Sequence, residues 1–375
     1  MAHAAENQKK NTGKKTNGKT IKNTDTNKSR KLKIILIAFA IIGFSLYCLV
    51  TKQNPIEGVS NIYQQVQGES PPQGEAQSQG ESQGYSETIT NGEMEVHFLD
   101  VGQADSTLII QNGKTMLFDV ATKSKGDDIA NYIKDLGINY VDVLVLSHPH
   151  DDHLGGTAEL LENIEVGIIY CPDFRDLGIK TVWYKDMLKE INVIDAIRNK
   201  DVPPDEQTSI LRYPRNEQGE FATFNIGDAK VQFLAPLEDK YSDKNNYSIC
   251  AKISYGTVDL MLTGDAHDEV EKELIQKDYN LDIEIFQAGH HGSDTSNSKE
   301  FLQAMSPEAI VISCGMKNKH DHPVKSVMEL FKKMKIPVYR TDESGTIVMV
   351  TDGENYSFNK KKGTYKSGSE YNKGD

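Results

Sequence analysis

Short apolar runs, separated by polar turns and amphipathic stretches, extend from residue 94 to residue 358. Runs rich in Val, Ile and Leu predict buried strands, and apolar residues that recur every three or four positions predict helices. The predicted strands are 94–99, 106–111, 114–119, 141–146, 166–171, 230–235, 248–255, 258–262, 283–287, 309–313, 338–340 and a last hairpin that turns at Asp352-Gly353. The predicted helices are 127–136, 156–163, 181–198, 267–276 and 325–334. Two strand-rich halves with interspersed helices favour an α/β domain, residues 93–358, in which two stacked sheets carry helices on both outer faces.

Two segments do not follow this pattern. Residues 199–228 combine Pro203-Pro204 with many charged side chains, which predicts a surface excursion near the entrance of a site. Residues 359–375 are polar and include Lys360, Lys361 and Lys362. We expect this tail to fray, because chain ends with few apolar residues are seldom held in place.

The N-terminal 92 residues differ from the domain in composition. Residues 1–33 carry ten Lys and Arg side chains against two acidic ones and almost no apolar residue, which predicts a disordered arm. Residues 34–50 contain no charge, and as a helix they would span roughly 25 Å, a little short of a bilayer core unless flanking residues snorkel. Residues 51–92 are rich in Gln, Gly, Ser and Glu and predict a flexible linker.

The apolar segment 34–50 fits either a cleaved signal peptide or an uncleaved anchor. A signal peptide has a short basic start and small residues at its cleavage site, whereas here the basic arm is long and residues 46–50 offer no such site. Bulky Tyr47 before Cys48 also argues against a lipoprotein signal. A single transmembrane helix is therefore favoured. Because dense Lys and Arg stay on the cytoplasmic side, we expect the arm in the cytoplasm and the domain outside the cell membrane, or secreted if the anchor is cleaved.

The net charge indicates which substrates the protein can attract, and the spacing of its cysteines indicates whether they form disulfides. The formal net charge is −13, of which residues 1–33 contribute +8, so the remaining residues carry −21. Such an acidic body does not attract a polyanion over long distances, so long nucleic acid is a less natural partner than a small or cationic substrate, unless bound metals reverse the local field. We expect a small-molecule or envelope-polymer substrate. Cys171, Cys250 and Cys314 lack a paired spacing, so we expect buried thiols in or at the end of strands.

The loop after strand 141–146 concentrates the candidate chemistry. Three of the 10 histidines fall between His148 and His153. On an extended backbone His148 and His150 point to the same side and can bind one cation, whereas Asp152 and His153, past the turn, can reach a second cation. A solvated loop that happens to hold histidines also fits, but imidazoles and carboxylates at ligand spacing favour a metal site.

Two later strand ends carry further candidate ligands. Asp265 follows strand 258–262 and would either cap the next helix or bridge two cations through its two oxygens. His290 and His291 follow strand 283–287. Adjacent histidines diverge on the backbone, so we expect one to bind metal and the other to orient a ligand or transfer a proton.

The HxHxDH pattern, the later Gly-Asp and a His-Gly-Ser resemble the metallo-β-lactamase superfamily. Further segments resemble one branch of it, the hydrolase domain of ComEC-type competence proteins, which is similar to bacterial cell-surface phosphorylcholine esterases. These segments are 97–106, 245–249, 289–293, 322–323 and 341–346. The resemblance covers nearly all of residues 94–358. It implies a four-layer αββα sandwich and a dinuclear hydrolase with two divalent cations, most often Zn²⁺ and in some relatives Mn²⁺.

The resemblance also implies roles for individual residues. The implied ligands are His148 and His150 for the first cation, Asp152 and His153 for the second, and Asp265 as the bridge. His291 is preferred as the last ligand of the second cation, although the strand-end position fits His290 equally. Asp119, at the end of the third strand, would orient a ligand.

Many members of the superfamily supply a third histidine to the first cation, and this chain departs from that pattern. Residues 154–264 contain no histidine, and the corresponding stretch is Asn245 to Ser248. An amide or hydroxyl is a weaker ligand than imidazole, so we expect the first cation to be held loosely or completed by water. His322 fits either a substrate-side group or an ordinary surface loop, and His97 fits an ordinary strand residue better than a ligand.

Hydrolysis of a phosphodiester is the favoured chemistry. Two adjacent cations lower the pKa of a shared water toward neutrality and neutralise charge on the oxygen under attack. Asp152 is placed to accept a proton, and His290 and His322 are further candidates for catalysis. Cleavage of β-lactam, lactone or thioester bonds suits the same fold, and a non-catalytic surface module with structural metals is the remaining alternative.

Overall fold

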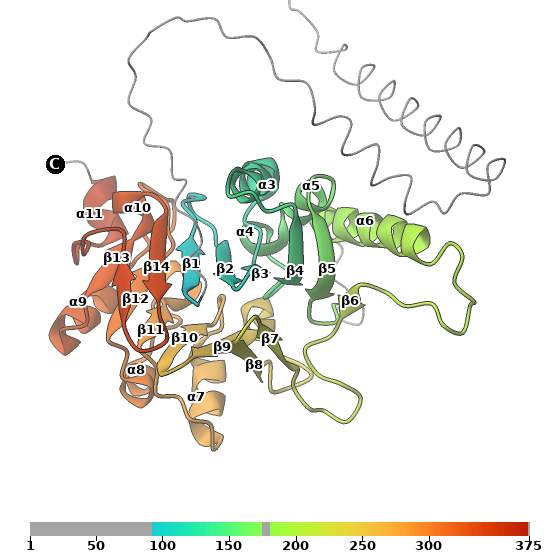
Figure 1. Cartoon of the computed structure of the whole chain (residues 1–375). Helices are drawn as coiled ribbons and strands as arrows, with labels where there is room; N and C mark the ends of the chain where they lie inside the picture. The colour runs from blue at the N-terminus through green and yellow to red at the C-terminus, as the bar shows by residue number, and fades with distance from the viewer. Residues whose placement is uncertain (1–91, 175–180, 374–375) are drawn as a thin grey trace, which may run out of the picture. The chain divides into compact units, whose positions relative to one another are not determined.

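Two mixed sheets form the centre of the domain. The computed structural model describes residues 92–174 and 181–373 (Figure 1). The eight-stranded sheet has the order β15-β14-β1-β2-β3-β4-β5-β6, and the seven-stranded sheet has the order β13-β12-β11-β10-β9-β8-β7. The strands of the first sheet are β1 (Met94–Phe98), β2 (Thr107–Gln111), β3 (Lys114–Phe118), β4 (Tyr140–Val145), β5 (Glu165–Tyr170), β6 (Leu211–Arg212), β14 (Ile347–Thr351) and β15 (Tyr356–Phe358). Those of the second are β7 (Thr223–Ile226), β8 (Ala229–Ala235), β9 (Cys250–Tyr255), β10 (Val258–Leu262), β11 (Ile285–Gln287), β12 (Ala309–Ile312) and β13 (Val338–Arg340).

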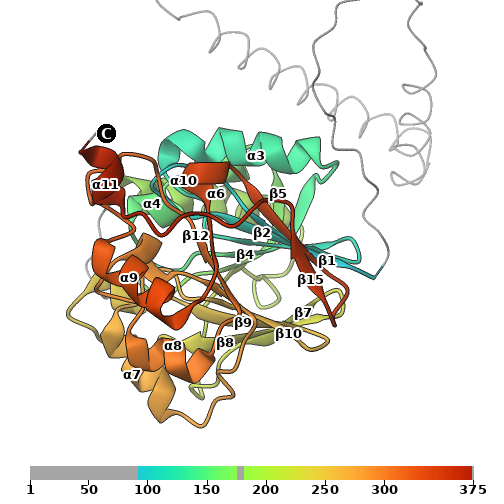
Figure 2. The same ribbon diagram turned by 90° about the vertical axis from the view of Figure 1, so that its left-hand side faces the viewer.

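Helices cover the outer face of each sheet (Figure 2). Over the first sheet lie α3 (Gly126–Asp135), α5 (Thr157–Leu161) and α6 (Val182–Arg198), and over the second lie α7 (Asp268–Gln276), α8 (Lys299–Met305) and α9 (Lys325–Met334). The shorter elements are η1 (Lys123–Lys125), α4 (Asp151–Leu154), η2 (Lys244–Tyr247), η3 (Gly289–Gly292), α10 (Thr341–Ser344) and α11 (Gly368–Asn372).

Alternation of side chains along the strands divides the core into three layers. Ile109 of β2 packs between the sheets in one cluster with Ile253 and Leu260 of the facing sheet. Its neighbour Leu108 points the other way, into the cluster under α3, α5 and α6. On the far side, Phe286 of β11 packs under α7, α8 and α9. These layers confirm the αββα sandwich.

The predicted elements agree with the structure within a few residues, and α9 has the predicted bounds 325–334. Cys171, Cys250 and Cys314 are buried free thiols in or next to strands, as expected. The prediction that residues 199–228 form a surface excursion is confirmed, because most of these residues are exposed, but the prediction that they lie near the site entrance is wrong. This segment contains β6 and β7, which extend the edges of both sheets, and none of its described residues lines the pocket around His150 and Asp265.

Parallel pairing brings the candidate residues to one edge of the two sheets. Strands β3 and β4 are parallel, as are β10, β11 and β12. The carboxyl ends of parallel strands meet at the same edge, so Asp119, the Ser147–His153 loop, Asp265 and His290-His291 come together. The sheets are tied there by a hydrogen bond of 3.0 Å from the backbone N–H of Ile249 to the carbonyl of Ser147.

The prediction that residues after Phe358 fray is wrong for residues 359–373. The backbone N–H of Gly363 donates to the carbonyl of Val338 at 2.7 Å, and that of Gly368 donates to the carbonyl of Pro323 at 2.8 Å. The buried Arg340 side chain also donates to the carbonyl of Lys366. The polar tail is therefore docked on the domain and ends in α11.

Ser367→Ala is expected to loosen α11, because Ser367 forms a capping box with Glu370 at the start of this helix. Loss of an N-cap side chain costs about 1 kcal/mol. Hydrogen exchange of the 365–373 amides should therefore be about fivefold faster. The exposed Lys373→Ala in the same segment is the control, and equal exchange in both variants would contradict a capping role.

The predicted arm 1–33, anchor 34–50 and linker, apart from its last residue, lie outside the described residues. Within 92–174 and 181–373, no helix combines the length and the apolar character needed to cross a bilayer.

Candidate metal centre

His148 and His150 form one half of the centre. The hydroxyl of Ser147 donates to Asp119 Oδ2 at 2.7 Å and accepts from His148 Nδ1 at 3.0 Å. The proton of the His148 ring is thereby placed on Nδ1, which leaves a lone pair on Nε2. That atom lies 3.0 Å from His150 Nδ1, so a single cation could contact both rings.

His153 and Asp152 belong to the other half. His153 Nδ1 donates to Asp119 Oδ2 at 2.8 Å, and its Nε2 faces Asp265 Oδ1 at 3.1 Å. Asp119 therefore holds the His153 ring through Nδ1, while its other oxygen accepts the backbone N–H of Ser147 at 2.7 Å. Asp152 Oδ2 lies 3.4 Å from His291 Nε2.

His290 and His291 diverge, as expected for adjacent histidines. Both have left-handed backbone conformations, with φ of 52° and 54°, which turn the two rings in different directions. His291 is buried and lies in the same group as Asp152, His153 and Asp265. His290 is less buried than His291, stacks on His267 at 5.4 Å and contacts Thr295 Oγ1 through Nδ1 at 2.9 Å. The structure thus favours His291 over His290 as the ligand of the second cation.

Asp265 lies between the two halves. Its Oδ1 faces His153 Nε2 at 3.1 Å and His291 Nε2 at 3.8 Å, whereas its Oδ2 faces His148 Nε2 at 3.7 Å and His290 Nε2 at 3.4 Å. One oxygen is thus directed to each half. This arrangement is the one that a carboxylate bridge between two cations requires.

Several ligand atoms at the centre lack a hydrogen-bond partner. His153 Nε2, His291 Nε2 and Asp265 Oδ1 are buried and unpartnered among the described residues. Buried polar atoms are nearly always paired, so these three are suited to a cation. Ligand atoms of Asp152, His153, Asp265 and His291 lie within 4.8 Å of one another, and so do those of His148, His150 and Asp265. Nitrogen and carboxylate donors in such groups suit Zn²⁺ or Mn²⁺.

The charges at the centre set different protonation states in its two halves. Burial, followed by the nearby His153, holds the pKa of His148 well below its ordinary value, so this ring is neutral. Burial alone would raise the pKa of Asp265, but His153, His290 and His291 hold it well below the ordinary value. Burial would lower the pKa of His153 and of His291, but nearby carboxylates, Asp265 among them, hold both well above the ordinary value, so these two rings carry a proton until a cation replaces it.

A polar pocket of about 640 Å³ opens over the centre. It is lined by Gln103, Thr122, His150, Asp151, Asp152, Asn245, Asp265, His290, His291, Asn318, Lys319, His320 and His322. His322 is 7% exposed and lies in this pocket rather than on an open surface loop. Burial, followed by His291 and His290, lowers the pKa of His322 to about 3, so its ring is neutral. His97 lies elsewhere, between Tyr132 and Glu95, as a strand residue.

Asn245 and Ser248 lie in the stretch that corresponds to the third histidine of many superfamily members. The Asn245 amide nitrogen contacts His267 Nε2 at 2.9 Å, and its Oδ1 is buried without a partner. Asn245 lines the same pocket as His150 and Asp265. The Ser248 hydroxyl accepts the backbone N–H of Asp265 at 3.1 Å and so fixes the backbone of the bridge.

Asp105 and Gln103 contribute to the site but were not predicted as site residues, although both lie in the 97–106 segment. Asp105 Oδ1 accepts from His291 Nδ1 at 3.1 Å, which the carbonyl of Ser313 also contacts at 3.0 Å. Asp105 thus does for His291 what Asp119 does for His153. Gln103 contacts His322. Neither the composition nor the spacing of the segment indicated these partners, because His291 and His322 lie about two hundred positions further along the chain.

Asp105→Asn is expected to weaken metal binding about 10–100-fold, because a carboxylate that orients a metal-binding histidine typically contributes this much. Competition with a chromogenic chelator measures the affinity, and circular dichroism checks the fold. Asp100→Asn, in the same loop but exposed, is the control. Equal affinities of the two variants would exclude an orienting role for Asp105.

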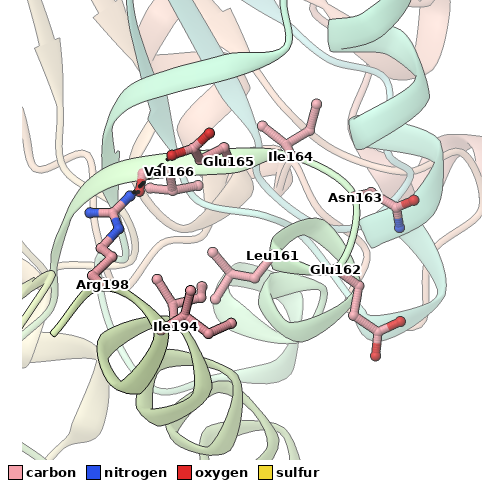
Figure 3. Close-up of a pocket in the computed structure, with 9 residues that line it drawn as sticks. Leu161, Glu162, Asn163, Ile164, Glu165, Val166, Ile194 and Arg198 are labelled. Atoms are coloured by element: carbon pink, nitrogen blue, oxygen red, sulfur yellow. Dashed lines mark hydrogen bonds and ion pairs between the residues drawn. The ribbon is translucent and has the colours of Figure 1, made fainter. Parts of the chain in front are cut away.

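A second hollow, of about 350 Å³, lies between α5, β5 and α6 (Figure 3). Leu161, Val166 and Ile194 give it an apolar lining, and Arg198 donates to the carbonyl of Val166 at 2.7 Å at one end. It contains none of the candidate ligands. Of the two hollows, only the polar pocket around His150 and Asp265 contains candidate metal ligands.

Comparison with known proteins agrees with this geometry. The profile of the metallo-beta-lactamase superfamily matches residues 99–315. ComE operon protein 3 of Bacillus subtilis is 27% identical over 293 residues, which is 73% of this chain and 34% of that protein. Competence protein ComA of Neisseria gonorrhoeae is 29% identical over 265 residues, which is 70% of this chain and 33% of that protein. The chain thus spans about a third of the length of these relatives.

Among solved structures, the metallo-beta-lactamase fold protein YhfI from Bacillus subtilis matches with a TM-score of 0.43 and 12% identity, over 69% of this chain and 100% of that one. The superfamily profile covers more than half of the present chain, and the sequence relatives are competence proteins. This protein therefore belongs to the metallo-β-lactamase superfamily, in the branch of the ComEC-type competence proteins.

Proposed function

We propose that this protein is a membrane-anchored, extracytoplasmic dinuclear metallohydrolase that cleaves phosphodiester bonds. The observation that carries the proposal is the placement of Asp265, with one oxygen toward His153 and His291 and the other toward His148. Both groups border a pocket that is large enough for a small substrate.

The candidate ligands fall into two groups, one for each cation. His148 and His150 would hold one cation, Asp152, His153 and His291 the other, and Asp265 both. Two divalent cations in this position, Zn²⁺ or Mn²⁺, would supply Lewis acidity and a water that ionises near neutral pH. Asn245 Oδ1 would complete the first group of ligands.

Asp152 is the proposed proton acceptor. Its side chain is 33% exposed and borders the pocket, so it can reach an attacking water. Burial would raise its pKa, but the His291 side chain 3.4 Å away and the charge of His153 hold the pKa well below the ordinary value. Asp152 is therefore ionised when the proton is released. His290 and His322 border the same pocket and would serve the departing oxygen.

An anionic substrate of modest size fits the pocket. Lys319 is the only Lys or Arg that lines the pocket among the described residues, and His150, His290, His320 and His322 add hydrogen-bonding groups. The acidic charge of the body opposes binding of a long polyanion. A small phosphodiester, or one in an envelope polymer, is therefore preferred to DNA.

Turnover by the metal-loaded full chain tests this proposal. Bis(p-nitrophenyl) phosphate, single-stranded DNA and a chromogenic cephalosporin would be compared under one condition. We expect hydrolysis of the aryl phosphodiester and little of the other two. Preferential β-lactam turnover would replace the proposed chemistry, and full metal occupancy without any turnover would favour a non-catalytic binding module.

The membrane anchor is a separate part of the proposal and rests on the apolar segment 34–50 and its basic flank. Alkaline carbonate should leave the full chain in the membrane fraction, and protease added to intact cells should remove the domain. Release by carbonate would contradict the anchor, and protection from the protease would contradict the orientation.

A further inference from the structure

The side-chain amide of Gln103 has a defined orientation. Its Oε1 accepts the backbone N–H of Gly315 at 3.1 Å. A backbone N–H can only donate, so the amide atom facing it must be the oxygen. The other end of the amide, Nε2, is thereby a donor with a fixed direction.

That donor faces His322. Gln103 Nε2 lies 3.3 Å from His322 Nδ1. Because an amide NH₂ group cannot accept, Nδ1 must present a lone pair, and the proton of the neutral ring must be on Nε2. A hydrogen bond that begins at the backbone of Gly315 thus determines the tautomer of a histidine in the pocket.

The surrounding loop holds the His322 ring in place. The Asn318 side chain accepts the backbone N–H of His322 at 3.1 Å and donates to the carbonyls of Gly315 at 2.9 Å and of His322. The ring itself packs against His290, with 5.4 Å between ring centroids, and against His291, with 6.2 Å. Its position beside His290 and His291 in the pocket places Nε2–H where a bound substrate would lie.

We propose that Gln103 is a positioning residue that fixes His322 as the Nε2–H tautomer, so that His322 donates a hydrogen bond to an anionic oxygen of the phosphodiester. The role toward substrate rests on the proposed function, whereas the tautomer does not. A donor that is already oriented needs no rearrangement when negative charge develops in the transition state, which is where such donors contribute most.

Gln103→Glu tests the tautomer with almost no change of shape. One carboxylate oxygen can still accept the N–H of Gly315, but the other can only accept, so Nδ1 of His322 must carry a proton. The ring ¹⁵N shifts and couplings of the Zn²⁺-loaded full chain, labelled at histidine, report the protonated nitrogen. The His322 signals are assigned by their loss in His322→Asn.

We expect a bare Nδ1 in the wild type and a protonated Nδ1 in Gln103→Glu. A protonated Nδ1 in the wild type, or a bare Nδ1 in the variant, would overturn the assignment. The wild-type spectrum alone tests the tautomer of His322, so the test does not depend on the folding of the variant.

Kinetics test the role toward substrate separately. Turnover of bis(p-nitrophenyl) phosphate by Gln103→Glu should fall about 10²-fold in kcat, the usual effect of losing one such donor. Bound metal should stay unchanged, because no contact joins Gln103 to a candidate ligand other than through His322 among the described residues. Gln303→Glu, exposed on α8, is the control for added charge. A reversed tautomer with unchanged kcat would exclude the donor role. A correct tautomer without turnover in the wild type would instead count against the proposed function.

Discussion

Combined replacement of His148 and Asp152 by alanine is expected to remove the bound metal and to lower phosphodiester turnover by about 10³-fold or more, equivalent to roughly 4 kcal/mol of transition-state stabilisation. The two residues belong to different groups of ligand atoms, so each cation loses a ligand. Asp152 is also the proposed proton acceptor. Metal content by elemental analysis and the initial rate on bis(p-nitrophenyl) phosphate are measured on the same sample.

Asp201→Ala, in an exposed stretch outside the pocket, is the control for the double variant. It should keep both the metal and the rate. If the double variant bound metal and turned over substrate like this control, the proposed hydrolytic mechanism would have to be abandoned.

Removal of metal from the wild type is expected to destabilise the domain strongly. Each site that is filled at about a thousand times its dissociation constant contributes about 4 kcal/mol to the free energy of unfolding. Without cations, the buried Nε2 atoms of His153 and His291 have neither a metal ion nor a hydrogen-bond partner among the described residues. Denaturant unfolding before and after treatment with a chelator, and after return of Zn²⁺, measures the difference.

The double variant provides the control for this experiment too. Its stability should not respond to the chelator, because it no longer holds the ions. A wild type whose free energy of unfolding is the same with and without chelator would show that the clustered side chains are stable without cations.

Local sequence signals predicted most of the fold. Alternation and turn residues located β2 and β3, and helical periodicity located α9, because these features arise within a few neighbouring residues. The docked tail was missed, since its contacts with Val338, Pro323 and Arg340 depend on positions distant in the sequence. Polar composition alone suggested a free end.

At the site, too, features set by local sequence signals could be predicted, whereas contacts between residues distant in the sequence could not. His148, His150, Asp152 and His153 lie close together in the sequence, and Asp265 follows a clear strand, so their convergence could be predicted. The choice between His290 and His291 depends on two left-handed backbone conformations, and no local sequence signal indicates these conformations. Asp105 and Gln103 act on histidines far along the chain, and their partners became apparent only from the folded geometry.

An anomalous diffraction measurement at the zinc edge, on crystals of the Zn²⁺-loaded protein, tests the central claim most directly. We expect two peaks about 3.5–4 Å apart, the usual separation in two-metal sites, with Asp265 between them. One peak should contact His148 and His150, and the other His153 and His291. A single peak, or peaks away from Asp265, would contradict the dinuclear centre.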